Sequence, residues 1–238
     1  MEIIKLNKQE HGIKVGKECP YSEPNIKEDC LLEVDGDIVG FYIKDVSKYS
    51  TKLSQLISIS NKEFRGDNVP KQEMSRGPQG TKADKAQRKK DGKNLVTQFS
   101  TILGSVAPKP HMRRPYPTIS SVHRENKANT FIKAMWAASV ESEKIIKQLT
   151  PKIYEEQLEL FKDVDKKWRF GNMFTSSISN FNIAASYHRD TGNIVGAVNV
   201  ILTKRNNSNG GCLNVPDYNV TFEQADNSML VYPAWKNI

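Results

Sequence analysis

The sequence predicts an α+β protein in which a jelly-roll core of short strands is flanked by helices. Helical periodicity between residues 129 and 168 is followed, over the last third of the chain, by short β-prone segments that turn residues separate. Helices followed by a run of strands are typical of a helical layer packed on a sandwich or barrel. With 238 residues, the chain is long enough for one large domain or for a domain with an extension.

Composition narrows the class of protein. The formal charge of +8 favours a polyanionic partner such as nucleic acid, although an excess of charge in a tail can also serve solubility alone. The three cysteines, Cys19, Cys30 and Cys212, have no paired spacing, which favours a reducing compartment over a disulfide framework or a zinc site. No apolar run is long enough to cross a bilayer and no signal-peptide layout is present. We therefore expect an intracellular protein, cytoplasmic or nuclear, of cellular or viral source.

Residues 1–94 are expected to form an N-terminal extension. Leu31 to Ile43 are two β-prone runs around Asp35-Gly36, which is a strong hairpin signal, and the residues before them are weakly patterned. From about Asn61 to Asn94, basic residues are spread among Gly, Pro, Gln and Ser. Such a segment cannot bury enough surface to order itself, so it is interpreted as a flexible loop. Whether this loop is merely solvated or is an arm that follows phosphates stays open.

The main domain is expected to begin at residue 95 with an ordered segment, Leu95 to Gly104. The next stretch, Ala107 to His123, contains four prolines together with His111, Arg113 and Arg114. Because prolines stiffen the backbone, these arginines could be held where a guanidinium matches a carboxylate or phosphate, or they could simply pair with surface acids. The two histidines of this stretch are interpreted as loop residues rather than ligands.

Two consecutive helices are predicted next. In the first, Asn129 or Thr130 is a candidate cap, and apolar residues recur at helical spacing up to Leu149. Thr150-Pro151 then supplies a cap with proline at the first helical position, and apolar side chains mark one face up to Trp168. Both apolar stripes are interpreted as core rather than as a cofactor-binding surface.

Six short strands are predicted after the helices, separated by turns that contain Asn, Gly, Asp or Pro. They are Phe174–Ser177, Asn182–Tyr187, Ile194–Thr203, Gly211–Val215, Tyr218–Glu223 and Ser228–Tyr232. This pattern is typical of a sandwich or barrel.

A histidine and an aspartate stand two residues apart where the second of these strands is predicted to end. The β-prone run that ends in Tyr187 leads into His188-Arg-Asp190, and Thr-Gly-Asn193 then starts a turn before the next run. Side chains two residues apart in an extended segment point to the same side. His188 and Asp190 are therefore candidate ligands of one metal ion.

The motifs resemble the oxygenase domain of the TET and J-binding-protein family. The resemblance rests on His188-Arg-Asp190-Thr-Gly-Asn193, on Asn209-Gly-Gly-Cys-Leu213 after a hydrophobic strand, and on the segment from Asn227 to Trp235. It covers roughly the last 60 residues well and the helical region before them loosely. Members of this family are Fe(II)- and 2-oxoglutarate-dependent dioxygenases with a double-stranded β-helix, cupin-like core, and they oxidise the methyl group of 5-methylcytosine or thymine in DNA.

The resemblance implies a role for four residues. His188 and Asp190 would bind iron, Asn193 would hydrogen-bond the base, and Arg114 would be an upstream arginine that holds 2-oxoglutarate. Two histidines and a carboxylate leave three iron positions open for the co-substrate and O₂, with ascorbate as the reductant. A base in duplex DNA must be flipped out of the stack to reach such a centre.

The chain departs from the family pattern in two places. Gly192 stands where some relatives carry a base-contacting histidine, so the choice between the two pyrimidines is left open. The family's second iron-binding histidine should follow the segment Met229 to Tyr232, but His11, His111, His123 and His188 are the only histidines of the sequence. We expect residues 95–238 to be a dioxygenase domain that lacks its C-terminal end. The alternative is that His111 or His123 completes the site.

Other functions remain open at this point. A degenerate or non-enzymatic basic DNA-binding module would explain the charge but would leave the His-x-Asp motif as an accident. A 2-oxoglutarate oxygenase acting on protein or on a small molecule would keep the metal site without needing the charge. A purely structural jelly roll would bind no Fe(II).

Overall fold

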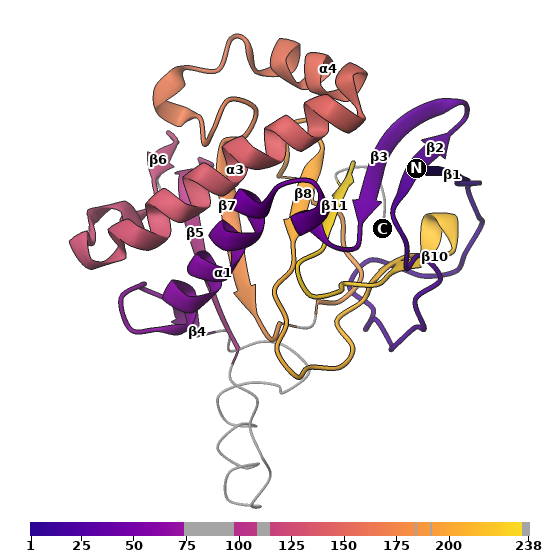
Figure 1. Cartoon of the computed structure of the whole chain (residues 1–238), viewed down its shortest axis with the longest axis horizontal. Coiled ribbons are helices and arrows are strands. Elements are labelled where there is room, and N and C mark those ends of the chain that lie inside the picture. The colour runs from indigo at the N-terminus through magenta and orange to yellow at the C-terminus, as the bar shows by residue number, and fades with distance from the viewer. Residues whose placement is uncertain (74–97, 109–114, 184, 191, 235–238) are drawn as a thin grey trace, which may run out of the picture.

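The fold is a mixed arrangement of helices and mostly antiparallel sheets, shown in Figure 1 as a computed structural model. The structure describes residues 1–73, 98–108, 115–183, 185–190 and 192–234. Within these residues the strands form three separate sheets and no closed barrel. The prediction of antiparallel sheets with flanking helices is confirmed at this level, and the jelly-roll topology stays a prediction. No helix in the described ranges is long and apolar enough to span a membrane.

The largest sheet has five strands and joins the two ends of the described chain. Its order is β1-β2-β3-β11-β8, with β1 parallel to β2 and the other pairs antiparallel. The strands are β1 Glu2–Lys5, β2 Cys30–Val34, β3 Asp37–Ile43, β8 Asn199–Leu202 and β11 Met229–Tyr232. The predicted division at residues 94 and 95 stays a prediction, but strands from both sides of it pair directly in this sheet.

The predicted hairpin between Leu31 and Ile43 is confirmed as β2 and β3. Asp35 and Gly36 connect the strands with φ of 52° and 89°. Two successive residues with positive φ match the tight turn that follows the twist of an antiparallel pair, and Asp-Gly is suited to it.

Side chains of the central strands point alternately to the two faces of the five-stranded sheet, and each face forms a hydrophobic core. Phe41 and Met229 point to one face and pack with residues of the helices, whereas Tyr42 and Leu230 point to the other face. That second face packs against a two-stranded ribbon of β9 (Leu213–Val215) and β10 (Val220–Phe222). The sheet is thus buried between a helical layer and a ribbon, as the period of two along a strand requires.

A second sheet is centred on β5 (Phe99–Val106), which pairs with β7 (Ser176–Phe181) over six residue pairs. The short strands β4 (Gln72–Glu73) and β6 (Thr118–Ile119) also pair with β5. Its buried face contributes Leu103 to a cluster with Phe64 and Phe131. Of the ordered segment predicted at Leu95–Gly104, residues 95–97 lie outside the described residues, and Phe99 to Gly104 belong to strand β5.

Three helices form the layer above the five-stranded sheet (Figure 1): α1 (Thr51–Arg65), α3 (Asn129–Leu149) and α4 (Pro151–Phe161). Short 3₁₀ turns lie between the longer elements: η1 Val46–Lys48, η3 Ser121–Arg124, η4 Asn126–Ala128, η5 Lys166–Trp168 and η6 Pro216–Tyr218. The prediction of two consecutive helices after residue 129 is confirmed, with proline at the start of the second.

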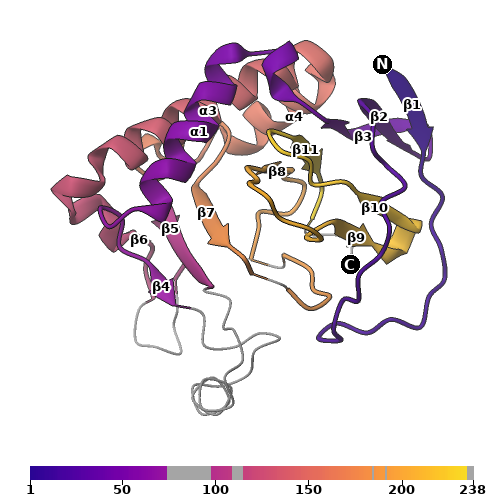
Figure 2. The same cartoon turned by 60° about the horizontal axis from the view of Figure 1, so that its bottom comes forward.

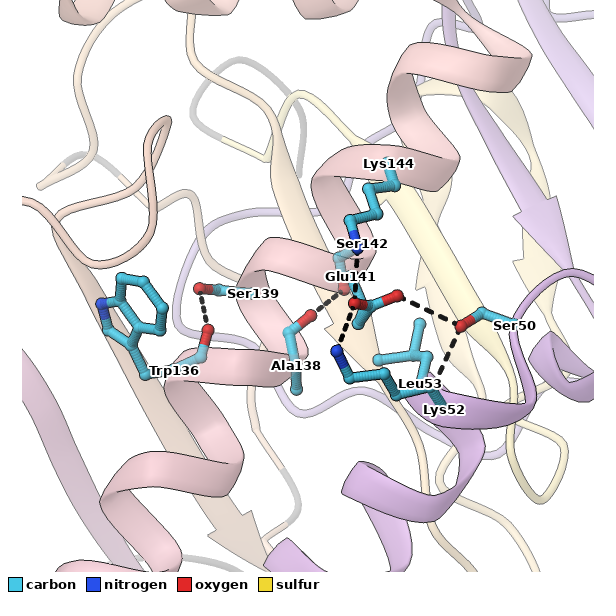
Figure 3. Close-up of polar contacts among 9 residues, drawn as sticks. All are labelled: Ser50, Lys52, Leu53, Trp136, Ala138, Ser139, Glu141, Ser142 and Lys144. Atoms are coloured by element: carbon cyan, nitrogen blue, oxygen red, sulfur yellow. Dashed lines mark hydrogen bonds and ion pairs between the residues drawn. The ribbon is translucent and has the colours of Figure 1, made fainter.

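A buried carboxylate ties α1 to α3. Glu141 of α3 accepts hydrogen bonds from Ser50 and Lys144 and pairs with Lys52 at 3.0 Å (Figure 3). The Ser50 hydroxyl in turn accepts from the N–H of Leu53 and caps α1. The cap and the ion pairs therefore lie in one network where the two helices meet.

Several predicted boundaries and caps are wrong. The helix α1 was not predicted, and residues 61–65 of the expected basic loop are its last turn. Neither Asn129 nor Thr130 caps α3. Thr150 stands at the N-cap position of α4 as predicted, but its hydroxyl donates back to the Ile146 carbonyl instead of accepting from the helix. The second helix ends at Phe161 instead of reaching Trp168, and residues 166–168 form a separate 3₁₀ turn.

The strand predictions are also corrected in detail. The expected strand Phe174–Ser177 lies instead at Ser176–Phe181, and the expected run Ile194–Thr203 is a strand only at Asn199–Leu202. The described residues of Asn182–Tyr187 form no strand. The three remaining predicted strands correspond to β9, β10 and β11.

Candidate metal centre

His188 and Asp190 lie in the loop that connects β7 to β8. Two backbone hydrogen bonds fix this loop: the Asp190 N–H donates to the Ala234 carbonyl at 3.2 Å, and the Asn193 N–H donates to the Asp190 carbonyl at 2.9 Å. Ala234 follows β11, so the first bond joins the loop to the end of the five-stranded sheet. The second bond closes a turn directly after the His-x-Asp motif.

The geometry of His188 leaves one ring nitrogen available. Its Nδ1 lies 2.7 Å from the Ser186 carbonyl oxygen. Because a carbonyl can only accept, Nδ1 carries the proton in the neutral ring and Nε2 keeps its lone pair. Nε2 lies 3.5 Å from Oδ1 of Asp190, and the two side chains are 56% and 37% exposed. An available nitrogen and a carboxylate oxygen therefore face each other at the surface.

Asp190 is held from its other oxygen. Oδ2 accepts a hydrogen bond from Nδ2 of Asn199 at 2.9 Å, and Oδ1 of Asn199 accepts from Nδ2 of Asn193 at 2.7 Å. Asn199 is the first residue of β8 and pairs with Tyr232 of β11. Burial, and secondarily the negative charge of Asp190, raises the pKa of the Tyr232 phenol. The carboxylate of Asp190 is thus held by β8, and its backbone is bonded to Ala234, two residues after β11.

The distance between His188 Nε2 and Asp190 Oδ1 is compatible with two ligands of one divalent metal ion. Ligand atoms about 2.1 Å from a metal are roughly 3 to 3.5 Å apart for angles between 90° and 110°. The observed separation of 3.5 Å agrees with this span without a rearrangement of the loop. The donor set, one imidazole and one carboxylate, suits iron and similar metals. The Nδ1–H bond to Ser186 is the outer contact that fixes a ligating imidazole in its tautomer.

A third ligand does not join the pair within the described residues. In the described ranges no group of three or more His, Cys, Asp and Glu side chains lies close enough to hold a metal. His123 is used elsewhere, because its Nε2 accepts from the Gly104 N–H at 2.9 Å and burial lowers its pKa. His11 pairs with Asp217 at 2.5 Å. His111 lies outside the described residues, so its part in the site stays untested.

Of the other two predicted site residues, one lies beside the His188–Asp190 pair and one lies outside the described residues. Asn193 lies beside the pair, although its side chain contacts Asn199 and through it Asp190. Arg114 lies outside the described residues, and its proposed contact with 2-oxoglutarate stays a prediction. Asn199 was missed as a site residue. Its signal was a polar side chain between Val198 and Val200 in an otherwise apolar run.

Tyr187, directly before His188, is fixed by the N-terminal segment. Its carbonyl accepts from the Gly16 N–H at 2.8 Å, and its N–H donates to the Lys17 carbonyl at 2.9 Å. Its hydroxyl donates to Asn214 at 2.9 Å, and burial, followed by the neighbouring Cys19, raises its pKa to about 12. Figure 2 shows the connection from β1 to β2 running around the outside of the β9–β10 ribbon. The residue directly before His188 is therefore held by pairing with a distant segment.

A cavity of about 340 Å³ lies between this N-terminal segment and the ribbon. It is lined by Gln9, Glu10, His11, Ile13, Ser22, Tyr187, Asn214, Pro216 and Asn219. Both ring nitrogens of His11 are engaged, Nε2 by Asp217 and Nδ1 by the Ile13 N–H. This histidine therefore holds the segment in place and offers no open coordination position.

Comparison with models of known protein families and with curated proteins finds no match for this chain.

Proposed function

We propose that the protein is an Fe(II)- and 2-oxoglutarate-dependent dioxygenase that hydroxylates the methyl group of 5-methylcytosine or thymine in DNA. The observation that carries the proposal is the His188–Asp190 pair, in which Nε2 of the imidazole lies 3.5 Å from a carboxylate oxygen while Nδ1 lies 2.7 Å from the Ser186 carbonyl oxygen. The resemblance of the motifs to the TET and J-binding-protein family supplies the reaction and the substrate.

His188 Nε2 and Asp190 Oδ1 would hold the iron. When bound, iron with 2-oxoglutarate and O₂ supplies the oxidation that converts a methyl C–H bond to C–OH while 2-oxoglutarate loses CO₂ and becomes succinate. The chain's own contribution is to orient the two ligands and to keep an open face beside them. Both side chains are partly exposed, so a co-substrate could reach them from solvent.

The surrounding strands support the jelly-roll form of the proposal. The loop with His188 and Asp190 is attached to β8 and to Ala234, two residues after β11, and β8 and β11 are adjacent strands of the five-stranded sheet. In a double-stranded β-helix, the metal ligands lie at the ends of paired core strands. The ribbon β9–β10 packs on the same sheet and would supply part of the second layer.

DNA as the partner is supported by where the charge lies. Residues 74–97 contain seven Lys and Arg against two Asp, and residues 109–114 contain three Lys and Arg without an acid. The rest of the chain is therefore nearly neutral, since the whole has a formal charge of +8. Phosphate contacts by such segments supply affinity without reading sequence. Arg114 in the second segment remains the proposed contact for 2-oxoglutarate, and Asn193 the proposed contact for the flipped base.

Product formation tests the proposal. Protein expressed from its complete reading frame is incubated with Fe(II), ascorbate, 2-oxoglutarate and DNA that contains 5-methylcytosine, and nucleosides and succinate are measured by mass spectrometry. We expect the amounts of hydroxymethylated pyrimidine and succinate to rise together with time. For Asp190→Ala we expect both to stay at background. Absence of both products from the folded unmutated protein would refute the proposal.

A catalytically inactive DNA-binding module is the second candidate, and the concentration of charge in residues 74–97 and 109–114 favours it. It predicts binding to DNA that Asp190→Ala leaves unchanged. Six phosphate contacts would weaken binding by about a thousandfold between 50 and 200 mM salt. Such binding without any hydroxylated product would favour this candidate, whereas oxidation of a protein or small molecule without DNA binding would indicate the other oxygenase class.

A further inference from the structure

We infer that Asn193 and Asn199 form a hydrogen-bonded relay that orients Asp190 as a metal ligand, so that Asn193 acts on the metal centre through Asn199. The inference rests on the proposed function for its metal. It adds a role for Asn199 and a different role for Asn193 from the base contact that the family resemblance implies.

The carboxylate sets the direction of the relay. An ionised carboxylate only accepts hydrogen bonds, so Asn199 must present its NH₂ group to Oδ2 of Asp190, at 2.9 Å. The carbonyl oxygen of the same amide then points away, and at 2.7 Å it meets Nδ2 of Asn193, which must donate. Each amide therefore has one orientation that satisfies both contacts.

The relay joins a loop to a rigid element. Asn199 begins β8, which pairs with β11 over four residues and lies at one edge of the five-stranded sheet. Asp190 itself lies in a loop whose other attachment to the sheet is the backbone bond to Ala234. A side chain on a strand is held more precisely than one on a loop, so Asn199 transfers the position of the sheet to the carboxylate.

The relay also selects which oxygen binds metal. Oδ2 is occupied by Asn199, while Oδ1 faces Nε2 of His188 at 3.5 Å. A carboxylate held in this way offers one oxygen to the metal rather than two. Outer contacts of this kind typically change metal affinity by 10- to 100-fold when they are removed.

Metal affinity measured without turnover tests the relay. Co(II) is titrated into the full chain by calorimetry, with the visible absorption of the bound ion as a second signal. We expect Asn199→Ala to weaken Co(II) binding by about 10- to 100-fold. The matched control is Asn206→Ala, an exposed asparagine in the loop after β8, which should bind Co(II) like the unmutated protein.

The two substitutions of Asn193 separate the relay from a base contact. Asn193→Ala leaves Asn199 free to donate to Asp190 and should weaken Co(II) binding only a few-fold. In Asn193→Asp, the new carboxylate accepts a hydrogen bond from the NH₂ group of Asn199. The amide of Asn199 then turns its own oxygen toward Asp190, so Co(II) binding should weaken more than in Asn193→Ala. The added negative charge by itself would strengthen the binding of a divalent cation. Weaker Co(II) binding in Asn193→Asp can therefore not be an effect of the charge.

The outcomes distinguish this inference from the proposed function. Unchanged Co(II) affinity in Asn199→Ala and Asn193→Asp, with weakened binding in Asp190→Ala, would overturn the relay and leave the metal centre intact. Unchanged affinity in Asp190→Ala would overturn the metal centre itself. If Asn193→Ala weakens binding of a 5-methylcytosine oligonucleotide but neither substitution of Asn193 changes Co(II) affinity, Asn193 contacts the base and the relay is wrong. Circular dichroism checks that each variant folds. If Asn199→Ala does not fold, Asn193→Asp, which changes a partly exposed loop residue, tests the relay in its place.

Discussion

At the scale of single residues, the spacing of His188 and Asp190 predicted that the two side chains could lie close together, and they lie 3.5 Å apart. The strand expected before His188 is not found, because the described residues from Asn182 to Tyr187 form no strand. The two side chains face each other in a loop that a local contact to Ser186 and contacts to Asn199 and Ala234, farther along the chain, hold in place. A partner that is distant along the chain, such as Gly16 opposite Tyr187, leaves no pattern in one sequence.

The ion pairs of Glu141 predict a pH dependence of stability. Its pKa is lowered mainly by Lys144, with a further contribution from Lys52, against the opposing effect of burial. A carboxyl group whose folded pKa is depressed stabilises the fold above its unfolded pKa, and this stabilisation is lost as the pH falls through the folded pKa. We expect Glu141→Gln (Figure 3) to lower the urea midpoint at neutral pH and to flatten its decline between roughly pH 5 and pH 3.

Urea denaturation at a series of pH values measures this effect. Glu155→Gln on the exposed side of α4 is the control, and it should follow the unmutated protein over the whole range. A Glu141→Gln curve parallel to that of the unmutated protein would mean that the ion pairs make no net contribution.

At the scale of secondary-structure elements, local signals were sufficient where short-range chemistry decides the structure. The hairpin at Asp35-Gly36, the proline at the start of α4 and the approximate places of β9, β10 and β11 could all be predicted. The helix α1 was missed although its sequence carries the local signals: Ser50 caps its start, and Leu53, Ile57 and Phe64 recur at helical spacing on its buried face.

The hairpin turn gives a prediction at this scale. Gly36 has a φ of 89°, in the region where a side chain is strained, so Gly36→Ala should lower the free energy of unfolding by about 1 kcal/mol. The control is Gly12→Ala, because Gly12 has no positive φ and an added Cβ meets nothing within 4 Å. Chemical denaturation measures both. Equal stabilities of the two variants would show that the turn adopts another conformation in solution.

At the scale of the whole molecule, the sheet order was beyond prediction from this sequence. The five-stranded sheet joins β1 to β3, from the first 43 residues, to β8 and β11, from the last 40. Strand pairing over such distances is decided by the complementarity of buried faces and not by local propensity. The predicted class, helices flanking antiparallel sheets, depended only on the order of elements and is confirmed. The same long-range pairing places the N-terminal segment beside Tyr187.

The central claim is that His188 and Asp190 bind one metal ion together, and nitrogen NMR of the histidine rings tests it most directly. The protein has four histidines, so a sample labelled with ¹⁵N at this residue type gives few signals, and His188→Ala assigns the one of interest. Without metal, we predict that His188 is protonated at Nδ1. On addition of Zn(II), its Nε2 signal should shift first, and Asp190→Ala should abolish that shift at the same metal concentration. A His188 ring that is protonated at Nε2, or a Zn(II) shift that is unchanged in Asp190→Ala, would contradict the claim.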